Sequence, residues 1–130
     1  MVQNILMIEM RKNIRYHTLA KARIEGAFEG ETLLKDISIT GCRVECTSYA
    51  EIKLHSRYRV EIIPEDTANV GMFDLLAEST WIHTEGYSCE IGFMIIEFPR
   101  KKLFQRYVDY LSWRYSQGNS MVGGNTSETL

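Results

Sequence analysis

The sequence predicts a mainly β fold, a small antiparallel β-barrel of six strands followed by one C-terminal α-helix. Three observations lead to this prediction: apolar and polar residues alternate through the middle of the chain, short turns separate the alternating stretches, and the period changes to three and four after Pro99. Alternation with a period of two is typical of half-buried strands. Several short antiparallel strands in one small domain favour a closed barrel, because closure removes exposed strand edges.

The six predicted strands follow one another with short connections. They cover residues 20–24, 33–39, 42–47, 59–62, 72–84 and 87–98. In the first strand, Ala20, Ala22 and Ile24 alternate with basic residues, which places the three apolar side chains on one face. The last two strands flank Glu85-Gly86, and their β-branched and aromatic content predicts a long hairpin.

The pattern after Pro99 predicts one amphipathic helix over residues 100–115. Its apolar residues recur at spacings of three and four: Leu103, Phe104, Tyr107, Val108 and Leu111. Pro99 lies at the predicted start, where the missing backbone N–H costs nothing. We expect this helix to lie against the barrel. Residues 117–130 are mostly Gly, Ser, Asn and Thr, so they are predicted to form a disordered tail.

Length and charge indicate one domain and a small ligand. The 130 residues, 45% of them hydrophobic, suit a single domain, which we assign to residues 11–116 between an N-terminal extension at 1–10 and the tail at 117–130. The formal net charge of −2 argues against binding to a nucleic acid polymer. Residues 11–23 nevertheless hold five Lys or Arg and no Asp or Glu. A local basic region on an acidic chain favours a small anionic ligand.

The cysteines predict neither a disulfide framework nor a metal site. They are three in number and lack Cys-x-x-Cys spacing. Cys42 and Cys46 share a parity with Val44 on a predicted strand, so we expect reduced thiols packed in the core. The apolar run at residues 5–8 is too short to span a membrane, and no signal-peptide pattern surrounds it. We therefore expect no membrane insertion and a cytoplasmic location.

Two short motifs predict a ligand site. The first is Arg11-Lys12-Asn13-Ile14-Arg15 and the second is Asp36-Ile37-Ser38-Ile39-Thr40-Gly41. An arginine fork bonds phosphate oxygens or the O6 and N7 edge of guanine, and it also stacks on a base. Asp36 complements it by accepting hydrogen bonds from guanine N1–H and N2–H, while Gly41 allows a positive φ or the close approach of a ligand. Together the motifs predict a receptor for a phosphate-bearing purine.

These motifs resemble those of the PilZ family, whose Arg-x-x-x-Arg and Asp/Asn-x-Ser-x-x-Gly motifs bind the bacterial second messenger cyclic di-GMP. The resemblance covers roughly residues 11–115, because Trp81 on one predicted strand is followed by Glu90-Ile91-Gly92-Phe93-Met94 on the next and then by the helix. It implies a PilZ-type barrel in which the segment around Arg11 and Arg15 is a loop that ligand orders.

The resemblance also implies a role for each motif residue. Arg11 and Arg15 would grip guanine and phosphate, Asp36 and Ser38 would bond the guanine edge or a phosphate, and Gly41 would permit the turn. Trp81 would form a wall of the site, and Lys12 and Met10 would be additional contacts. In PilZ domains the residue before the first motif arginine influences whether one or two nucleotides bind. The apolar Met10 favours a single nucleotide, since it adds no guanidinium.

Each motif also has a purely structural interpretation. Arg11 and Arg15 would in that case form surface ion pairs with Glu9 and Glu25, which contribute little. Asp36 and Ser38 would cap a β-turn, a role compatible with ligand binding. Trp81 would be a packing residue of the barrel rim.

The sequence predicts a binding protein and not an enzyme. It contains no recognisable nucleophile motif, no metal-ligand spacing and no glycine-rich phosphate loop at the start of a helix. We expect no cofactor and no metal. The ligand is expected to be cyclic di-GMP, the protein partner an unidentified effector, and the protein itself a monomer or weak homodimer.

Two other functions were weighed. One is a PilZ-like adaptor for pilus, flagellar or secretion machinery that does not depend on nucleotide; it would show an exposed apolar patch, at residues 5–8 or on the helix near Trp113. The other is a small-barrel RNA-binding module. That module would need exposed aromatic residues interleaved with basic ones on one sheet face, which the sequence lacks.

Overall fold

The computed structural model describes residues 14–27, 31–46 and 51–122. In these ranges the chain forms seven strands, one 3-10 turn and one α-helix. Their bounds are β1 (Tyr16–His17), β2 (Lys21–Ile24), β3 (Thr32–Ile37), β4 (Gly41–Cys46), β5 (Arg57–Ile63), η1 (Asp66–Ala68), β6 (Phe73–Glu85), β7 (Ser88–Glu97) and α2 (Lys101–Val122).

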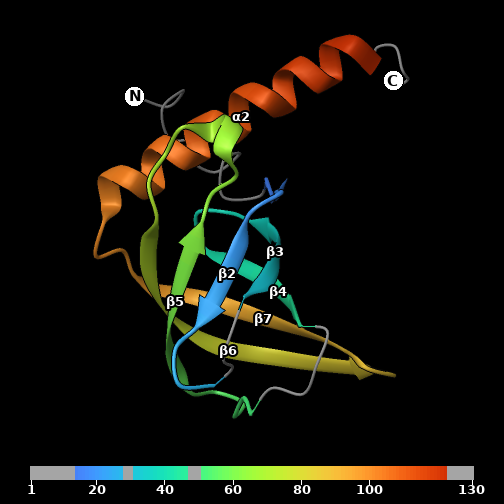
Figure 1. The fold of residues 1–130 in the computed structure, drawn as a ribbon, viewed down its shortest axis with the longest axis vertical. Coiled ribbons are helices and arrows are strands. Elements are labelled where there is room, and N and C mark those ends of the chain that lie inside the picture. Colours follow the sequence, from blue (N-terminus) through green and yellow to red (C-terminus); the bar gives the residue numbers. More distant parts are fainter. Residues whose placement is uncertain (1–13, 28–30, 47–50, 123–130) are drawn as a thin grey trace, which may run out of the picture.

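The strands form a closed antiparallel barrel, as the alternating pattern predicts. Neighbouring strands pair in the order β3-β2-β5-β6-β7-β4, and a β3–β4 pairing closes the ring of six (Figure 1). All six predicted strands are present within a few residues of their predicted bounds. The two-residue strand β1 lies outside the ring and pairs with the end of β3.

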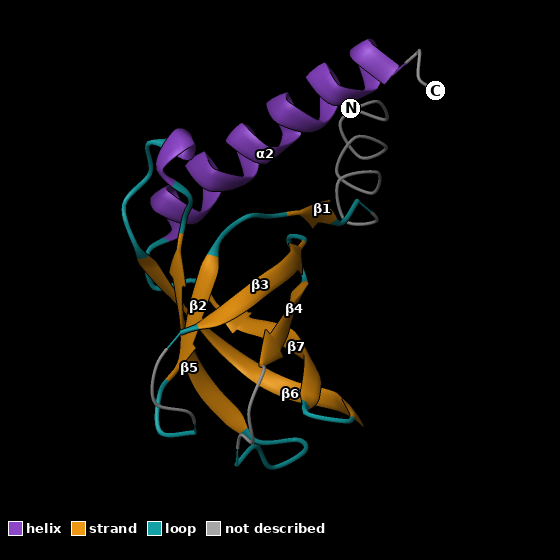
Figure 2. Cartoon of the chain, turned by 45° about the vertical axis from the view of Figure 1, so that its right-hand side comes forward, coloured by secondary structure: helices purple, strands orange, loops and turns teal. Residues whose placement is uncertain are grey.

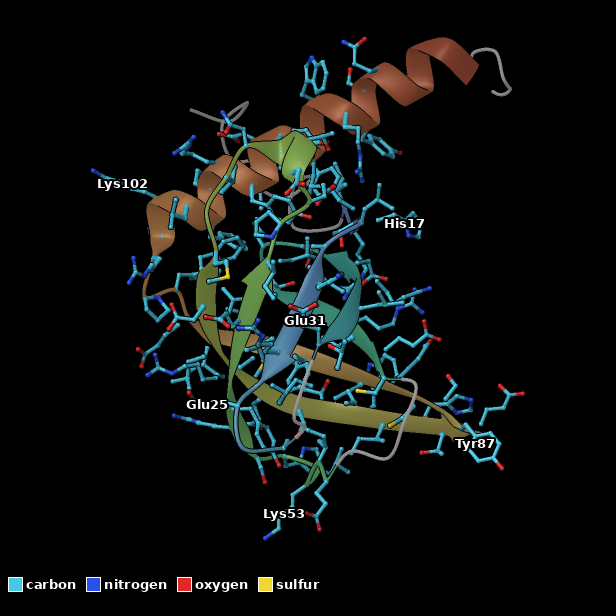
Figure 3. The ribbon with its side chains drawn as sticks, viewed as in Figure 1. His17, Glu25, Glu31, Lys53, Tyr87 and Lys102 are labelled. Carbon is cyan, nitrogen blue, oxygen red and sulfur yellow. The ribbon has the colours of Figure 1, made fainter. Side chains whose placement is uncertain are left out.

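The longest strands, β6 and β7, form the predicted hairpin. Glu85 pairs with Ser88 at its end, and Gly86 in the connecting turn has a φ of +63°, a conformation that glycine adopts without strain. Figure 3 shows Tyr87 at the tip of this hairpin, beyond the body of the barrel. Tyr87 is 94% exposed there, so the tip is fully accessible to solvent.

The barrel interior contains the cysteines, as the sequence predicts. Cys42, Val44 and Cys46 alternate along β4 and are fully buried, and the three cysteines carry no disulfide. Burial raises the pKa of the Cys42 thiol to about 12 and that of Cys46 to about 11. Both thiols are therefore protonated and unreactive at neutral pH.

Helix α2 lies across one end of the barrel and contacts β1 and η1 (Figure 2). Four of the five predicted apolar positions are buried, and Leu103 is partly buried; Phe104 and Tyr107 pack against the Phe73 ring at centroid distances of 6.1 and 5.9 Å. In the part of the chain that the structure describes, no helix combines the length and apolar content needed to cross a membrane.

The helix is longer than the sequence predicts. It continues to Val122, whereas the apolar pattern ends near Tyr115 and a disordered tail was expected from residue 117. Once a helix is nucleated, each added residue gains a backbone hydrogen bond whether or not the apolar pattern continues, and Gly118 opposes this by only about 1 kcal/mol. Residues 123–130 lie outside the described residues.

Glu65 fastens the helix to the barrel end. Its carboxylate accepts a hydrogen bond of 2.6 Å from the Tyr107 hydroxyl and pairs with Arg114 at 2.8 Å. Arg114 also donates to the backbone carbonyl of His17 on β1. Burial, reinforced by the bond to Glu65, raises the pKa of Tyr107 well above its ordinary value. The helix is thereby tied to the strand that follows Arg15.

Candidate functional site

The structure brings together one residue from each predicted motif, Arg15 and Asp36. The Arg15 side chain lies 3.3 Å (Nε) and 3.2 Å (Nη2) from Oδ1 of Asp36, although 21 residues separate them in the sequence. This contact follows from the strand pairing, because β1 begins one residue after Arg15 and places His17 opposite Asp36. Arg15 remains half exposed, at 48%, whereas the Asp36 side chain is 8% exposed.

A β-bulge in β3 orients the Asp36 side chain toward Arg15 and toward a second arginine, Arg43. The register of β3 against β4 shifts between Leu34 and Asp36, so both Leu34 and Ile37 remain buried in the core while Asp36 pairs with Arg43. The second carboxylate oxygen, Oδ2, lies 2.9 Å from Nη2 of Arg43. Asp36 thus holds one guanidinium on each oxygen.

Arg43 is a site residue that the sequence analysis missed. It lies between the core positions Cys42 and Val44 on β4, so alternation does predict that it faces outward. Its position opposite Asp36 depends on the bulged register, which no local pattern encodes. Arg43 also pairs with Glu90 on β7 at 3.4 Å. Within the described part of the chain, its buried Nε has no hydrogen-bond partner.

Ser38 holds the turn between β3 and β4. Its hydroxyl oxygen accepts hydrogen bonds from the backbone N–H groups of Thr40 and Gly41, at 3.2 Å each, and its own N–H donates to the Gly41 carbonyl at 2.8 Å. The side chain is fully buried. In this conformation Ser38 shapes the turn and presents no atom to a ligand.

Gly41 is required for a reason different from the predicted one. Its φ is not positive, so that part of the prediction is wrong, and the neighbouring strand lies close to its Cα. The close approach of a ligand stays a prediction. A Cβ at this position would lie 2.6 Å from the carbonyl oxygen of Phe93 on β7. The glycine therefore permits close approach of two backbones where β4 begins.

Trp81 lies on the same outer face of the barrel as Asp36 and Arg43. Asp36 pairs with Arg43, Arg43 with Gly92, and Gly92 with Trp81, so four strands contribute to one row across the sheet, which we call the outer row. Paired residues of antiparallel strands share a face. The Trp81 indole, 43% exposed, lies against Gly92, where a Cβ would come within 2.1 Å of its Nε1.

The remaining predicted site residues lie outside the described part of the chain. These are Met10, Arg11 and Lys12. Of the two arginines of the first motif, the structure therefore describes Arg15. Of the residues whose positions are described, the structure brings Arg15, Asp36 and Arg43 into contact and places Trp81 in the same row.

A separate pocket opens beside β2 and β3. It has a volume of about 310 Å³ and is lined by Lys21, Glu31, Thr32, Leu33 and Glu45. Lys21 lies 3.3 Å from Glu31 and, with Arg23, lowers the pKa of that carboxyl; Figure 3 labels Glu31 on this side of the barrel. Within the described ranges, no cluster of His, Cys, Asp or Glu is arranged to bind a metal ion.

Comparison with known proteins shows the fold. No protein-family model matches the sequence, and no curated protein matches it. Among solved structures, the chain is similar to the Bacillus subtilis inhibitor of motility (MotI/DgrA), with a TM-score of 0.64 and 18% sequence identity. The match covers 80% of this chain and 50% of that one, so this chain spans about half the length of its structural neighbour. The chain thus shares the fold of that structure over the matched part, and this fold is a closed six-stranded barrel with an outer strand and a C-terminal helix.

Proposed function

We propose that this protein is a non-enzymatic receptor for cyclic di-GMP that signals to an effector protein through a change of surface. The observation that carries the proposal is the contact between Arg15 and Asp36, since it joins the two motifs on the outside of a PilZ-like barrel. The half-exposed guanidinium of Arg15 is available to an anionic ligand, and Asp36 orients it.

The chemistry of the outer row supports a purine nucleotide as ligand. Guanidinium forks bond phosphate oxygens bidentately and also bond the Hoogsteen edge of guanine. An exposed indole offers a surface on which a base stacks, a contact worth about 1–3 kcal/mol in other nucleotide-binding proteins. Because Ser38 is buried, its role in the proposed site is to hold the turn that positions Asp36.

A route for the signal runs through β1. Arg15 directly precedes this strand, Arg114 of α2 donates to the His17 carbonyl, and the Tyr16 ring lies edge-on to Tyr115 at 6.0 Å. Ligand that draws Arg15 away from Asp36 would therefore disturb contacts of the helix. The exposed surface of α2 is where we expect an effector to detect the change.

A second candidate is an adaptor that binds a protein partner without nucleotide. Two observations favour it: Asp36 and Ser38 are already hydrogen-bonded within the chain, and Trp113 and Tyr115 on α2 are 60% and 52% exposed. The structural neighbour is described as an inhibitor of motility, which suits partners in the flagellar machinery. For this chain, pilus and secretion machinery remain equivalent expectations.

Isothermal titration separates the two candidates. The purified protein is titrated with cyclic di-GMP, with GTP and cyclic di-AMP as controls, at low and high salt. We expect selective binding of cyclic di-GMP in the micromolar range or tighter, with an affinity that falls as salt is added, because charged groups recognise the phosphates. Absence of heat with all three nucleotides would reject the receptor and leave the adaptor.

A further inference from the structure

The Arg43 guanidinium bonds two carboxylates, one at a short distance and one at a long distance. Its Nη2 bonds Asp36 at 2.9 Å, whereas its Nη1 reaches Glu90 at only 3.4 Å. The Nε is buried and has no hydrogen-bond partner among the residues that the structure describes. The hydrogen-bonding capacity of the Arg43 guanidinium is therefore incompletely used. Replacing the distant Glu90 carboxylate by an acceptor at a shorter distance is favourable.

Arg43 lies in the middle of the outer row, so a ligand that spans this row would contact it. Arg43 pairs with Asp36 on one side and with Gly92 on the other, and Gly92 is covered by the Trp81 indole. A ligand that bonds Arg15 and stacks on Trp81 must therefore pass over Arg43. The Arg43 side chain is 31% exposed although its Nε is buried, so part of the side chain is accessible to solvent.

We propose that Arg43 is a further arginine of the cyclic di-GMP site and that Glu90 sets the affinity by competing with the ligand for it. This inference rests on the proposed function. In the ligand-free protein the Glu90 carboxylate occupies Nη1; on binding, a phosphate oxygen replaces it, while Asp36 keeps its bond to Nη2. Glu90 also repels the phosphate directly, since both are negatively charged.

Glu90→Gln tests the competition without removing any residue that binds ligand. Glutamine keeps the size of glutamate and loses its charge, so we expect cyclic di-GMP to bind about three- to tenfold more tightly. Glu61→Gln is the matched control, because Glu61 pairs with Arg23 at 3.1 Å on the outside of the barrel and lies on β5, which pairs with neither β4 nor β7. We expect its affinity to stay within about twofold of wild type.

Arg43→Ala tests the proposed contact itself. We expect binding to weaken about ten- to a hundredfold and the dependence of affinity on salt to become shallower, because one phosphate contact is lost. Arg23→Ala is the control, since Arg23 also bridges two carboxylates on the barrel exterior, Glu31 and Glu61. Thermal unfolding of each variant establishes that the fold is intact.

The double variant links the two residues. If Glu90 acts through Arg43, Glu90→Gln in the Arg43→Ala background recovers less affinity than it adds to the wild type. Wild-type binding that is sensitive to Arg15→Ala but unaffected by Arg43→Ala and Glu90→Gln would overturn this inference and leave the receptor standing. Absence of cyclic di-GMP binding by the wild type would overturn both.

Discussion

At the scale of single residues, the central feature is the carboxylate of Asp36. It is nearly buried, and its two oxygens face Arg15 and Arg43. A buried carboxylate is costly unless charged donors satisfy it, so the two guanidiniums allow Asp36 to occupy this position. In return, Asp36 fixes the directions in which both arginines point.

Replacing Asp36 with Asn removes this organising charge. We expect Asp36→Asn to lower the free energy of unfolding by about 1–3 kcal/mol, because an amide is a poorer partner for two guanidiniums, and to weaken cyclic di-GMP binding. Urea denaturation and titration measure the two effects. Asp74→Asn is the control, since Asp74 bonds Arg59 at 2.7 Å away from the outer row. Equal losses of ligand affinity in the two variants would contradict a specific role for Asp36.

Gly92 supports the Trp81 indole. In Gly92→Ala the new Cβ would lie 2.1 Å from Nε1 of Trp81, so the indole must move while the backbone pairing remains. We expect altered fluorescence of Trp81 and cyclic di-GMP binding weakened by about 1–3 kcal/mol, the range of a stacking contact. The measurement uses a Trp113→Phe background, because Trp81 and Trp113 are the two tryptophans of the chain. Gly71→Ala, where a Cβ meets no atom within 4 Å, should change neither property.

Sequence motifs predicted part of this site. Arg15 and Asp36 were identified by residue type and spacing, and the structure brings them into contact. The position of Arg43 opposite Asp36 was not predictable, because a bulge in β3 sets the register. A positive φ at Gly41 was wrongly predicted, and the close contact with the Phe93 carbonyl was not predicted, because Phe93 is distant in the sequence.

At the scale of helices and strands, the elements with the longest sequence patterns were the ones that the sequence predicted correctly. The six barrel strands carry alternating residues, and Gly86 marks the turn of the hairpin, so both were predicted. Strand β1 was missed, because two residues are too few to show a period. The end of α2 was also missed, because backbone bonding and not an apolar pattern extends the helix to Val122.

The link between β1 and α2 depends on Arg114. Arg114→Ala removes both the ion pair with Glu65 and the bond to the His17 carbonyl. We expect a loss of about 1–3 kcal/mol in the free energy of unfolding and faster amide hydrogen exchange in the helix. Arg106→Ala is the control on the same helix, because the one bond that Arg106 makes to the described residues is long and exposed, at 3.4 Å to the Asn69 carbonyl. The same loss in both variants would show that Arg114 does not fasten the helix.

At the scale of the whole molecule, the buried thiols of the barrel interior make the free energy of unfolding fall at alkaline pH. The pKa of Cys42 is raised from 9.0 to about 12 and that of Cys46 from 9.0 to about 11, in both cases chiefly by burial. In the unfolded chain these thiols ionise above pH 9, whereas in the folded protein they stay neutral. The unfolded state is therefore favoured as pH rises from about 9 toward 11.

We expect the free energy of unfolding to be insensitive to the two thiols below pH 8 and to fall between pH 9 and 11. Each thiol contributes a slope of up to about 1.4 kcal/mol per pH unit. Urea denaturation across this range, with Cys42→Ala alongside the wild type, measures the slope. The variant is less stable at pH 7 but should lose stability less steeply above pH 9. Parallel curves would contradict a buried, neutral thiol at position 42.

Also at the scale of the whole molecule, strand β1 connects the proposed site to the surface of helix α2. The arginine segment leads into β1, β1 contacts α2, and α2 crosses the end of the barrel (Figure 2). The proposed recognition at the outer row and the proposed display on the helix would thus be separated in space and connected by one short strand. This arrangement suits a receptor that acts on a partner protein.

The measurement that tests the account most directly is titration of cyclic di-GMP into three proteins: wild type, Arg15→Ala and Arg23→Ala. Both arginines are about half exposed and pair with carboxylates, but only Arg15 belongs to the proposed site. We predict selective wild-type binding, weakening of about ten- to a hundredfold in Arg15→Ala, and a change within about twofold in Arg23→Ala. Wild-type affinity retained in Arg15→Ala, or equal losses in both variants, would contradict the proposed site.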